Sequence, residues 1–200
     1  MTRILLLFAH PALEKSRVHR HLMQRLPRLA GLTVQDLYQA YPDFDVDVPR
    51  EQELLLAHDL ILLQHPFYWY STPALLKQWQ DLVLEHGWAY GSTGTALQGK
   101  RMSSVVTTGG GAAAYTPEGL NRFTVRELLA PVEQTARLCG MEYLPPYLIQ
   151  GTHRMTQPDI EAAAGRLARA ITALHDDRVD LDAWRSAPSL DAVVGPEAGL

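Results

Sequence analysis

The feature that most constrains the fold is a pair of short, unbroken apolar runs. Residues 4–9 read Ile-Leu-Leu-Leu-Phe-Ala, and residues 60–63 read Leu-Ile-Leu-Leu. Both have the length of a strand, and neither alternates apolar with polar residues. Such runs are typical of strands that are buried on both faces, as in a parallel sheet covered by helices on each side.

The rest of the chain alternates strand-like runs with helical stretches. This alternation predicts βαβ units and a parallel sheet. Five strands in a chain of this length predict an α/β, flavodoxin-like three-layer sandwich with a five-stranded parallel sheet, whose ligand lies at the carboxyl ends of the strands. The predicted strands are residues 3–9, 33–38, 60–64, 101–107 and 143–149, and the predicted helices are residues 16–29, 49–57, 74–84, 124–138 and 158–175.

The length and composition indicate one domain followed by a tail. Two hundred residues are a normal length for one compact domain, and no change in composition marks a second one. Residues 1–175 are therefore predicted to form the flavodoxin-like domain. Residues 176–200 show little periodicity and include Pro188, Pro196 and Gly199. We expect this tail to be loosely ordered or to pack on a partner subunit.

Charge and cysteine content exclude several classes of protein. Eighteen Lys and Arg against 22 Asp and Glu give a formal charge of −4, which provides no basic surface for nucleic acid. The single cysteine, Cys139, excludes an intramolecular disulfide and a cysteine zinc cluster, and it favours a reducing cytosol. The apolar run at residues 4–9 is too short to span a bilayer or to form a signal-peptide core. We therefore expect a cytoplasmic protein.

Three loops are predicted to meet at the carboxyl edge of the sheet, and the first lies between His10 and Ser16. It leads into a helix, whose free N–H groups and positive dipole end would bind a phosphate. The Ser16 hydroxyl and the charges of Lys15 and Arg17 could assist. The alternative is that Ser16 is only an N-cap and that His10 makes one structural hydrogen bond.

The second and third loops have equally unusual compositions. The second loop contains four consecutive aromatic residues, Phe67-Tyr68-Trp69-Tyr70, which could line one side of a site for a flat, conjugated ligand. The alternatives are that they form a hydrophobic staple with the next helix or a dimer contact. Residues 107–115 contain three consecutive glycines, which allow the backbone to approach a ring closely, although a flexible surface turn is the alternative. They match neither the dinucleotide fingerprint nor the P-loop. Together the loops predict a site for a flavin mononucleotide, which has a phosphate, a ribityl chain and a flat ring.

Several motifs in order along residues 3–150 resemble the flavodoxin-like NAD(P)H:quinone oxidoreductases. Within that family the chain is most similar to the bacterial ancillary flavoproteins of glutathione-regulated potassium efflux systems, a similarity that extends to residues 37–44 and 139–146. The matching motifs are Phe8-Ala-His-Pro11, His65-Pro-Phe-Tyr-Trp-Tyr70, Pro73-Ala-Leu-Leu-Lys-Gln-Trp79, Gly87-Trp-Ala-Tyr-Gly91 and Thr107-Thr-Gly-Gly110.

The resemblance implies a homodimer with one flavin per subunit, near the dimer interface. It implies hydride transfer from NAD(P)H to the flavin and then to a quinone, by ping-pong use of one pocket. The subgroup favours FMN, with FAD as the alternative. The cofactor-binding residues that it implies are His10, Ser16, Arg17, Val18, His19, Phe67, Tyr68, Trp69, Tyr70, Thr107, Thr108, Gly109 and Gly110.

The resemblance also assigns two catalytic positions. Tyr115 matches the tyrosine that assists charge on the reduced flavin in the animal quinone reductases. Those enzymes carry a histidine six residues later, where this chain has Asn121. An amide can donate a hydrogen bond but cannot become a cation near neutral pH. A proton relay through that histidine is therefore not expected here.

Other functions are weighed against this one. The chain has no Gly-x-Ser-x-Gly elbow for a hydrolase and no His-Glu-x-x-His pattern, so no metal site is expected. A regulatory subunit of a membrane potassium efflux transporter is a real alternative, which would place the protein peripherally at the inner membrane. A flavodoxin-type electron carrier is a third interpretation, although such a carrier needs no substrate cavity.

Overall fold

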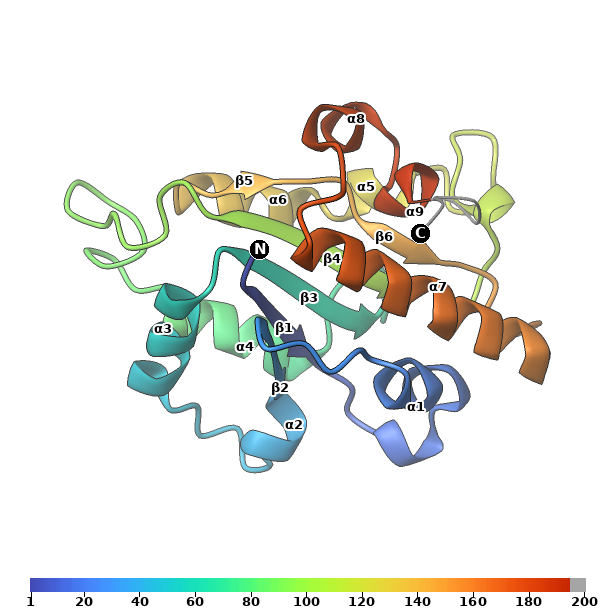
Figure 1. Cartoon of the computed structure of the whole chain (residues 1–200), viewed down its shortest axis with the longest axis horizontal. Helices are drawn as coiled ribbons and strands as arrows, with labels where there is room; N and C mark the ends of the chain where they lie inside the picture. Colours follow the sequence, from blue (N-terminus) through green and yellow to red (C-terminus); the bar gives the residue numbers. More distant parts are fainter. Residues whose placement is uncertain (195–200) are drawn as a thin grey trace.

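Six strands form one parallel sheet at the centre of the molecule (Figure 1). The computed structural model describes residues 1–194. The strands follow the order β2-β1-β3-β4-β5, and β6 also pairs with β4. This order is that of the flavodoxin-like doubly wound fold, so the predicted fold class is confirmed. The strands are β1 (Ile4–Phe8), β2 (Leu32–Asp36), β3 (Leu60–Pro66), β4 (Arg101–Thr107), β5 (Glu142–Tyr143) and β6 (Tyr147–Ile149).

The predicted fifth strand is divided into two pieces. β5 and β6 both run parallel to β4, and Pro145-Pro146 lies between them. Proline has no backbone N–H to donate to a neighbouring strand, so the ladder is interrupted there. The prediction of five continuous strands is corrected accordingly, although the sheet keeps five positions across its width.

Helices cover both faces of the sheet (Figure 1). Leu5 and Leu7 of β1 point into one hydrophobic cluster, whereas Ile4, Leu6 and Phe8 point into the other. All five side chains are completely buried. The first face carries α3 (Val48–Ala57), α4 (Ala74–Val83) and α6 (Ala130–Leu138), and the second carries α1 (Arg17–Gln24) and α7 (Gln157–His175).

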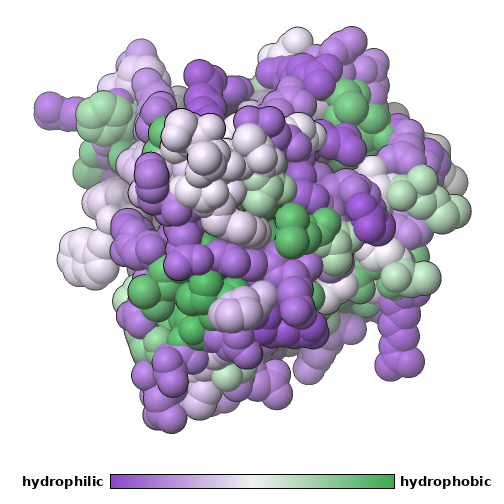
Figure 2. Space-filling model, turned by 90° about the vertical axis from the view of Figure 1, so that its left-hand side faces the viewer, coloured by the Kyte–Doolittle hydropathy of each residue, from purple (hydrophilic) through white to green (hydrophobic). Residues whose placement is uncertain are grey.

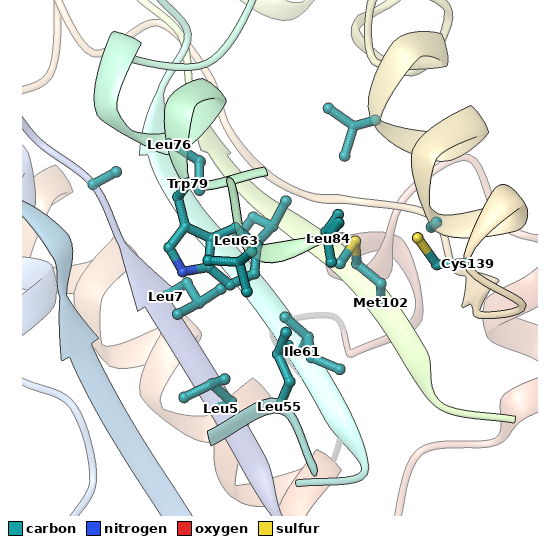
Figure 3. Packing of buried hydrophobic residues seen from close by; sticks show 14 of the residues in the cluster. Leu5, Leu7, Leu55, Ile61, Leu63, Leu76, Trp79, Leu84, Met102 and Cys139 are labelled. Atoms are coloured by element: carbon teal, nitrogen blue, oxygen red, sulfur yellow. The ribbon is translucent and has the colours of Figure 1, made fainter. Parts of the chain in front are cut away.

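The cluster beneath α3 and α4 contains one buried carboxylate among apolar side chains. Leu7, Leu63 and Trp79 pack together there (Figure 3). The Glu51 carboxylate accepts hydrogen bonds from Tyr41 Oη at 2.6 Å and from Trp79 Nε1 at 2.8 Å. These bonds compensate the desolvation of Glu51, which is fully buried, and the bond from Trp79 ties α3 to α4.

Several helix boundaries differ from the prediction. α1 ends at Gln24, not near Leu29. The helix expected at residues 124–138 is two helices, α5 (Val125–Leu128) and α6, and Pro131 in the first turn of α6 accounts for the break. A short helix, α2 (Leu37–Ala40), follows β2 because the Asp36 side chain accepts a hydrogen bond from the Gln39 N–H as an N-cap.

The C-terminal tail is ordered as far as the structure describes it. α8 (Leu181–Ser186) and α9 (Leu190–Val193) pack on the same chain, beside β6 and α7. Trp184 is fully buried, and its Nε1 donates to the Pro145 carbonyl at 2.8 Å. For residues 176–194 the structure thus differs from the loose order that we expected. Pro196 and Gly199 lie outside the described residues, and packing on a partner subunit stays a prediction.

β3 and β4 begin on the left in Figure 1 and end on the right, and β1 pairs parallel to β3, so the loops that follow β1, β3 and β4 lie at the same edge of the sheet. Figure 2 shows the opposite, left-hand side, where hydrophobic residues form a limited patch bordered by hydrophilic ones. Within residues 1–194, no helix combines the length and apolar character needed to cross a bilayer.

We predict that Trp184 anchors the tail to the domain. Trp184→Ala should lower the free energy of unfolding by about 3–5 kcal/mol, because it removes a large buried ring. Trp184→Phe should cost about 1 kcal/mol for the lost hydrogen bond. Urea denaturation measures both variants. A loss below about 1 kcal/mol for the alanine variant would show that the tail contributes little to the fold.

Candidate functional site

A cleft of about 530 Å³ lies at the carboxyl edge of the sheet. The loops after β1, β3 and β4 contribute to it, as predicted, and the loop after β6 closes it on a further side. Its volume lies within the range of small-molecule sites. The lining residues are His10, Ala12, Lys15, Ser16, Arg17, Val18, His19, Pro66, Phe67, Tyr68, Thr107, Gly109, Thr152 and His153.

One end of the cleft is the amino terminus of α1. Ser16 is the N-cap, and its Oγ accepts the His19 N–H at 3.1 Å. The hydroxyl hydrogen of Ser16 and the first-turn N–H groups of Arg17 and Val18 remain available to a ligand, because the first N–H groups of a helix have no partner within it. Lys15 and Arg17 add positive charge. The capping role and the phosphate-binding role that we weighed for Ser16 are thus compatible.

Two buried histidines form the inner wall of the cleft. The rings of His10 and His19 lie 5.0 Å apart, edge to face. His19 Nε2 is 2.8 Å from Thr107 Oγ1, whereas His19 Nδ1 is buried and has no hydrogen-bond partner within residues 1–194. Burial, together with the neighbouring histidines, holds the pKa of His19 well below its usual value, and burial lowers the pKa of His10 too. Both rings are therefore neutral near pH 7 and present hydrogen-bonding nitrogens without charge.

Thr107 joins three elements of the site. Its side chain bonds to His19 of α1, and its carbonyl oxygen accepts the Phe67 N–H at 2.8 Å. The next carbonyl, that of Thr108, accepts the Thr152 N–H at 3.0 Å. The end of β4 therefore sets the positions of α1, the aromatic loop and the loop after β6.

The four consecutive aromatic residues do not form one wall. Phe67 and Tyr68 line the cleft, and the Tyr68 ring lies 6.1 Å from the ring of His10. Trp69 and Tyr70 adopt left-handed backbone conformations, with φ of 49° and 64°. These turn the chain, so that Trp69 is 92% exposed and Tyr70 lines a separate hollow. Bulky residues rarely adopt such φ values, which marks this loop as strained.

The remaining predicted residues lie beside the cleft. The Tyr115 ring packs close to Gly110 and stands 6.2 Å from the ring of Phe67. Burial raises the pKa of Tyr115, so its hydroxyl stays protonated and can donate. Asn121 Oδ1 accepts the Tyr70 hydroxyl at 3.2 Å. The Thr108 hydroxyl donates to the Gly110 carbonyl at 2.7 Å, which shapes the glycine loop.

Sequence reasoning missed part of the lining. Nine of the predicted cofactor-binding residues line the cleft, and Trp69, Tyr70, Thr108 and Gly110 do not. The lining residues that the sequence did not single out are Ala12, Pro66, Thr152 and His153. Lys15, which the sequence indicated only as a nearby positive charge, also lines the cleft. Thr152 and His153 enter only because β6 pairs with β4.

A third histidine, His65, is fully buried behind the cleft. Its Nδ1 lies 2.9 Å from the Pro66 carbonyl, and its Nε2 has no hydrogen-bond partner in the part of the chain that the structure describes. Burial lowers the pKa of His65 to about 4, against 6.5 for an unperturbed histidine. The folded protein thus binds this proton less readily than the unfolded chain does, so the stability that neutral His65 provides is present above pH 6.5 and is lost as the pH falls toward 4.

We predict that His65→Met makes stability less dependent on pH. Acidification from pH 7 to pH 4 should lower the free energy of unfolding of the native protein by about 3 kcal/mol through protonation of His65 in the unfolded chain. His65→Met should lack this contribution to the loss. Chemical denaturation across that range gives the measurement. His86→Met, which removes an exposed histidine, is the matched control. Equal acid sensitivity in the native protein and in His65→Met would contradict the assignment.

The comparisons with known proteins agree with this fold. The family model described as flavodoxin-like fold matches residues 2–171. The glutathione-regulated potassium-efflux system ancillary protein KefG of Pectobacterium carotovorum is 48% identical over 164 residues, covering 82% of this chain and 89% of that protein.

Two solved structures are also similar. The general stress protein 14 of Treponema denticola, in complex with FMN, is 38% identical with a TM-score of 0.79, covering 88% of this chain and 99% of that one. An NADPH-quinone reductase from P. pentosaceus is 34% identical with a TM-score of 0.73, covering 83% and 97%. From its fold and its sequence, the chain belongs to the flavodoxin-like fold family.

Proposed function

We propose that the chain is an FMN-dependent NAD(P)H:quinone oxidoreductase. The observation that carries the proposal is the cleft itself, which joins a helix amino terminus with two cations to an aromatic pair, Phe67 and Tyr68. His19 Nδ1, which is buried and has no hydrogen-bond partner among the described residues, is the kind of atom that a bound ligand satisfies. The FMN complex of one relative and the NADPH-quinone reductase name of another support this assignment.

The residues of the cleft fit the three parts of FMN. Ser16, Arg17 and Val18 would hold the phosphate at the start of α1. The neutral polar groups of His10, His19 and Thr107 would face the ribityl hydroxyls. Phe67 and Tyr68 would contact the ring, with the backbone of Thr108, Gly109 and Gly110 along its other side. None of the described residues that line the cleft is acidic, which favours an anionic ligand.

FMN, when bound, would supply the chemistry of two-electron hydride transfer between NAD(P)H and a quinone in a ping-pong cycle. The protein contributes position and electrostatics. Preorganised N–H donors of the glycine loop would stabilise negative charge at the polar edge of the ring, by about 3 kcal/mol for each well-placed donor. Tyr115 and Asn121 are proposed as further donors, Tyr115 because it keeps its proton. The neutral histidines need not exchange protons for a hydride step.

A homodimer is the assembly that the surface favours. Large side chains beside the cleft are exposed: Trp69 by 92%, Leu120 by 89% and Phe123 by 54%. Tyr70 and Asn121 join the two loops that carry them, and a hollow of about 490 Å³ lies between these loops. Contiguous exposed apolar groups of this kind typically mark an interface. A second copy of the chain would cover them next to the flavin.

A regulatory role is the second candidate. The 48% identity to KefG supports an ancillary function on a potassium efflux transporter, which would bring the protein to the inner membrane as a peripheral subunit. This role is compatible with flavin binding. Co-purification with such a transporter, together with increased efflux, would support it. FMN binding without quinone turnover would favour it over the reductase.

We predict that the purified protein takes up FMN and that NAD(P)H bleaches the flavin absorbance, with turnover when a soluble quinone is added. Tyr68→Ala should weaken FMN binding about tenfold through lost ring contact, whereas Tyr68→Phe keeps the ring and should bind nearly as well as the native protein. Flavin fluorescence titration measures both. Protein that binds neither FMN nor FAD would contradict the proposal.

We also predict that the protein has twice the mass of one chain in sedimentation experiments. The double variant Trp69→Ser, Leu120→Ser should have the mass of a monomer. Leu138→Ser is the matched control, since Leu138 is 58% exposed at the distant carboxyl end of α6. Analytical ultracentrifugation at micromolar concentration distinguishes these states. A native protein that is monomeric there would refute the dimer.

A further inference from the structure

The loop after β6 forms a wall of the cleft that is held from both ends. The Gly151 N–H donates to the Gly110 carbonyl at 2.8 Å. The backbone N–H and the hydroxyl of Thr152 both donate to the Thr108 carbonyl, each at 3.0 Å. At the far end of the loop, the Arg17 guanidinium donates to the Met155 carbonyl at 3.0 Å. The loop is therefore fixed between the glycine loop and the start of α1.

His153 sits on this loop with its ring against Gly109. A Cβ on Gly109 would lie 2.2 Å from His153 Nε2, far inside van der Waals contact. The φ of Gly109 is not in the left-handed region, so backbone conformation alone does not demand glycine there. Glycine at this position is what allows the imidazole to occupy its place at the cleft.

The chemistry around His153 indicates what it binds. Lys15, Ser16 and Arg17 line the same cleft, and Arg17 holds the loop that carries His153. Because the Thr152 hydroxyl donates to Thr108, it cannot donate to a ligand as well. His153 is exposed, and its side chain makes no hydrogen bond to any residue within 1–194. An imidazole N–H in a cleft that also holds two cations and a helix amino terminus is suited to a phosphate oxygen.

We infer that His153 is a direct ligand of the flavin phosphate, donating a hydrogen bond from the loop after β6 opposite the start of α1. The inference deepens the proposed function and rests on it. The site thereby gains a fourth phosphate-binding element besides Ser16, Arg17 and the amides of α1. The ligand class is a flavin that carries a phosphate monoester, in preference to riboflavin.

The test compares FMN with riboflavin, which lacks the phosphate, in fluorescence titrations of the apoprotein. His153→Ala should weaken FMN binding about tenfold, the size of one hydrogen bond to a charged group, and should leave riboflavin binding unchanged. His153→Gln, which keeps an N–H donor, should recover part of the FMN affinity. Arg154→Ala is the matched control, because Arg154 is exposed, adjacent and outside the cleft lining. Unchanged FMN binding in His153→Ala, or equal losses for both flavins, would overturn the inference.

Gly109→Ala provides an independent test because its Cβ must displace the His153 ring. It should lower the ratio of FMN affinity to riboflavin affinity in the native background but not in the His153→Ala background, since coupled residues are not additive. A direct effect of the new Cβ on the flavin ring changes both affinities and cancels in the ratio, so a fall in the ratio in both backgrounds would refute the contact. Thermal unfolding confirms that each variant is folded. If the native protein binds no flavin, the proposed function itself is wrong. If the native protein and His153→Ala bind FMN with equal affinity, only the role of His153 is wrong.

Discussion

The burial of β1 on both faces is the constraint on which the rest of the structure depends. Its five side chains are completely buried, alternately in the two hydrophobic clusters. A strand of this kind must have helices above and below it, and parallel neighbours reached by helical crossovers. Every such crossover returns the chain to the same end of the sheet, so the loops that follow the strands meet at one edge. The cleft forms at this edge because the burial of β1 requires helices on both faces of the sheet, and the crossovers bring the strand-end loops together.

At that edge, a few backbone and side-chain contacts align loops that are distant in sequence. Thr107 forms hydrogen bonds with the His19 side chain and the Phe67 N–H. The Thr108 carbonyl accepts a hydrogen bond from Thr152, in the loop that carries His153. The histidines beneath the cleft stay neutral because burial disfavours their charged form. Positive charge is thus concentrated at the start of α1, where a phosphate would bind, and is absent from the buried inner wall of the cleft. This separation allows one site to hold an anion at one end and a flat ring at the other.

The sequence was most informative where a local pattern has one structural meaning. Unbroken apolar runs identified β1 and β3, and the unusual residues directly after strands identified most of the cleft. Prediction failed where the outcome depends on backbone angles or on strand pairing. The aromatic residues from Phe67 to Tyr70 look alike in sequence, but positive φ at Trp69 and Tyr70 turns these two away from the cleft. His153 carries no local signal, because its place at the site depends on β6 lying against β4.

By itself, the sequence determined the fold class, the parallel sheet and the edge at which the site lies, because hydrophobic periodicity and strand-end residues are local properties of the chain. Only the tertiary structure decided which side chains line the cleft. It also decided that β5 and β6, separated by Pro145-Pro146, both pair with β4, and that the buried Trp184 holds residues 181–193 to the domain. These features arise from contacts between segments far apart in the chain, whose energies depend on packing and not on any single stretch of residues.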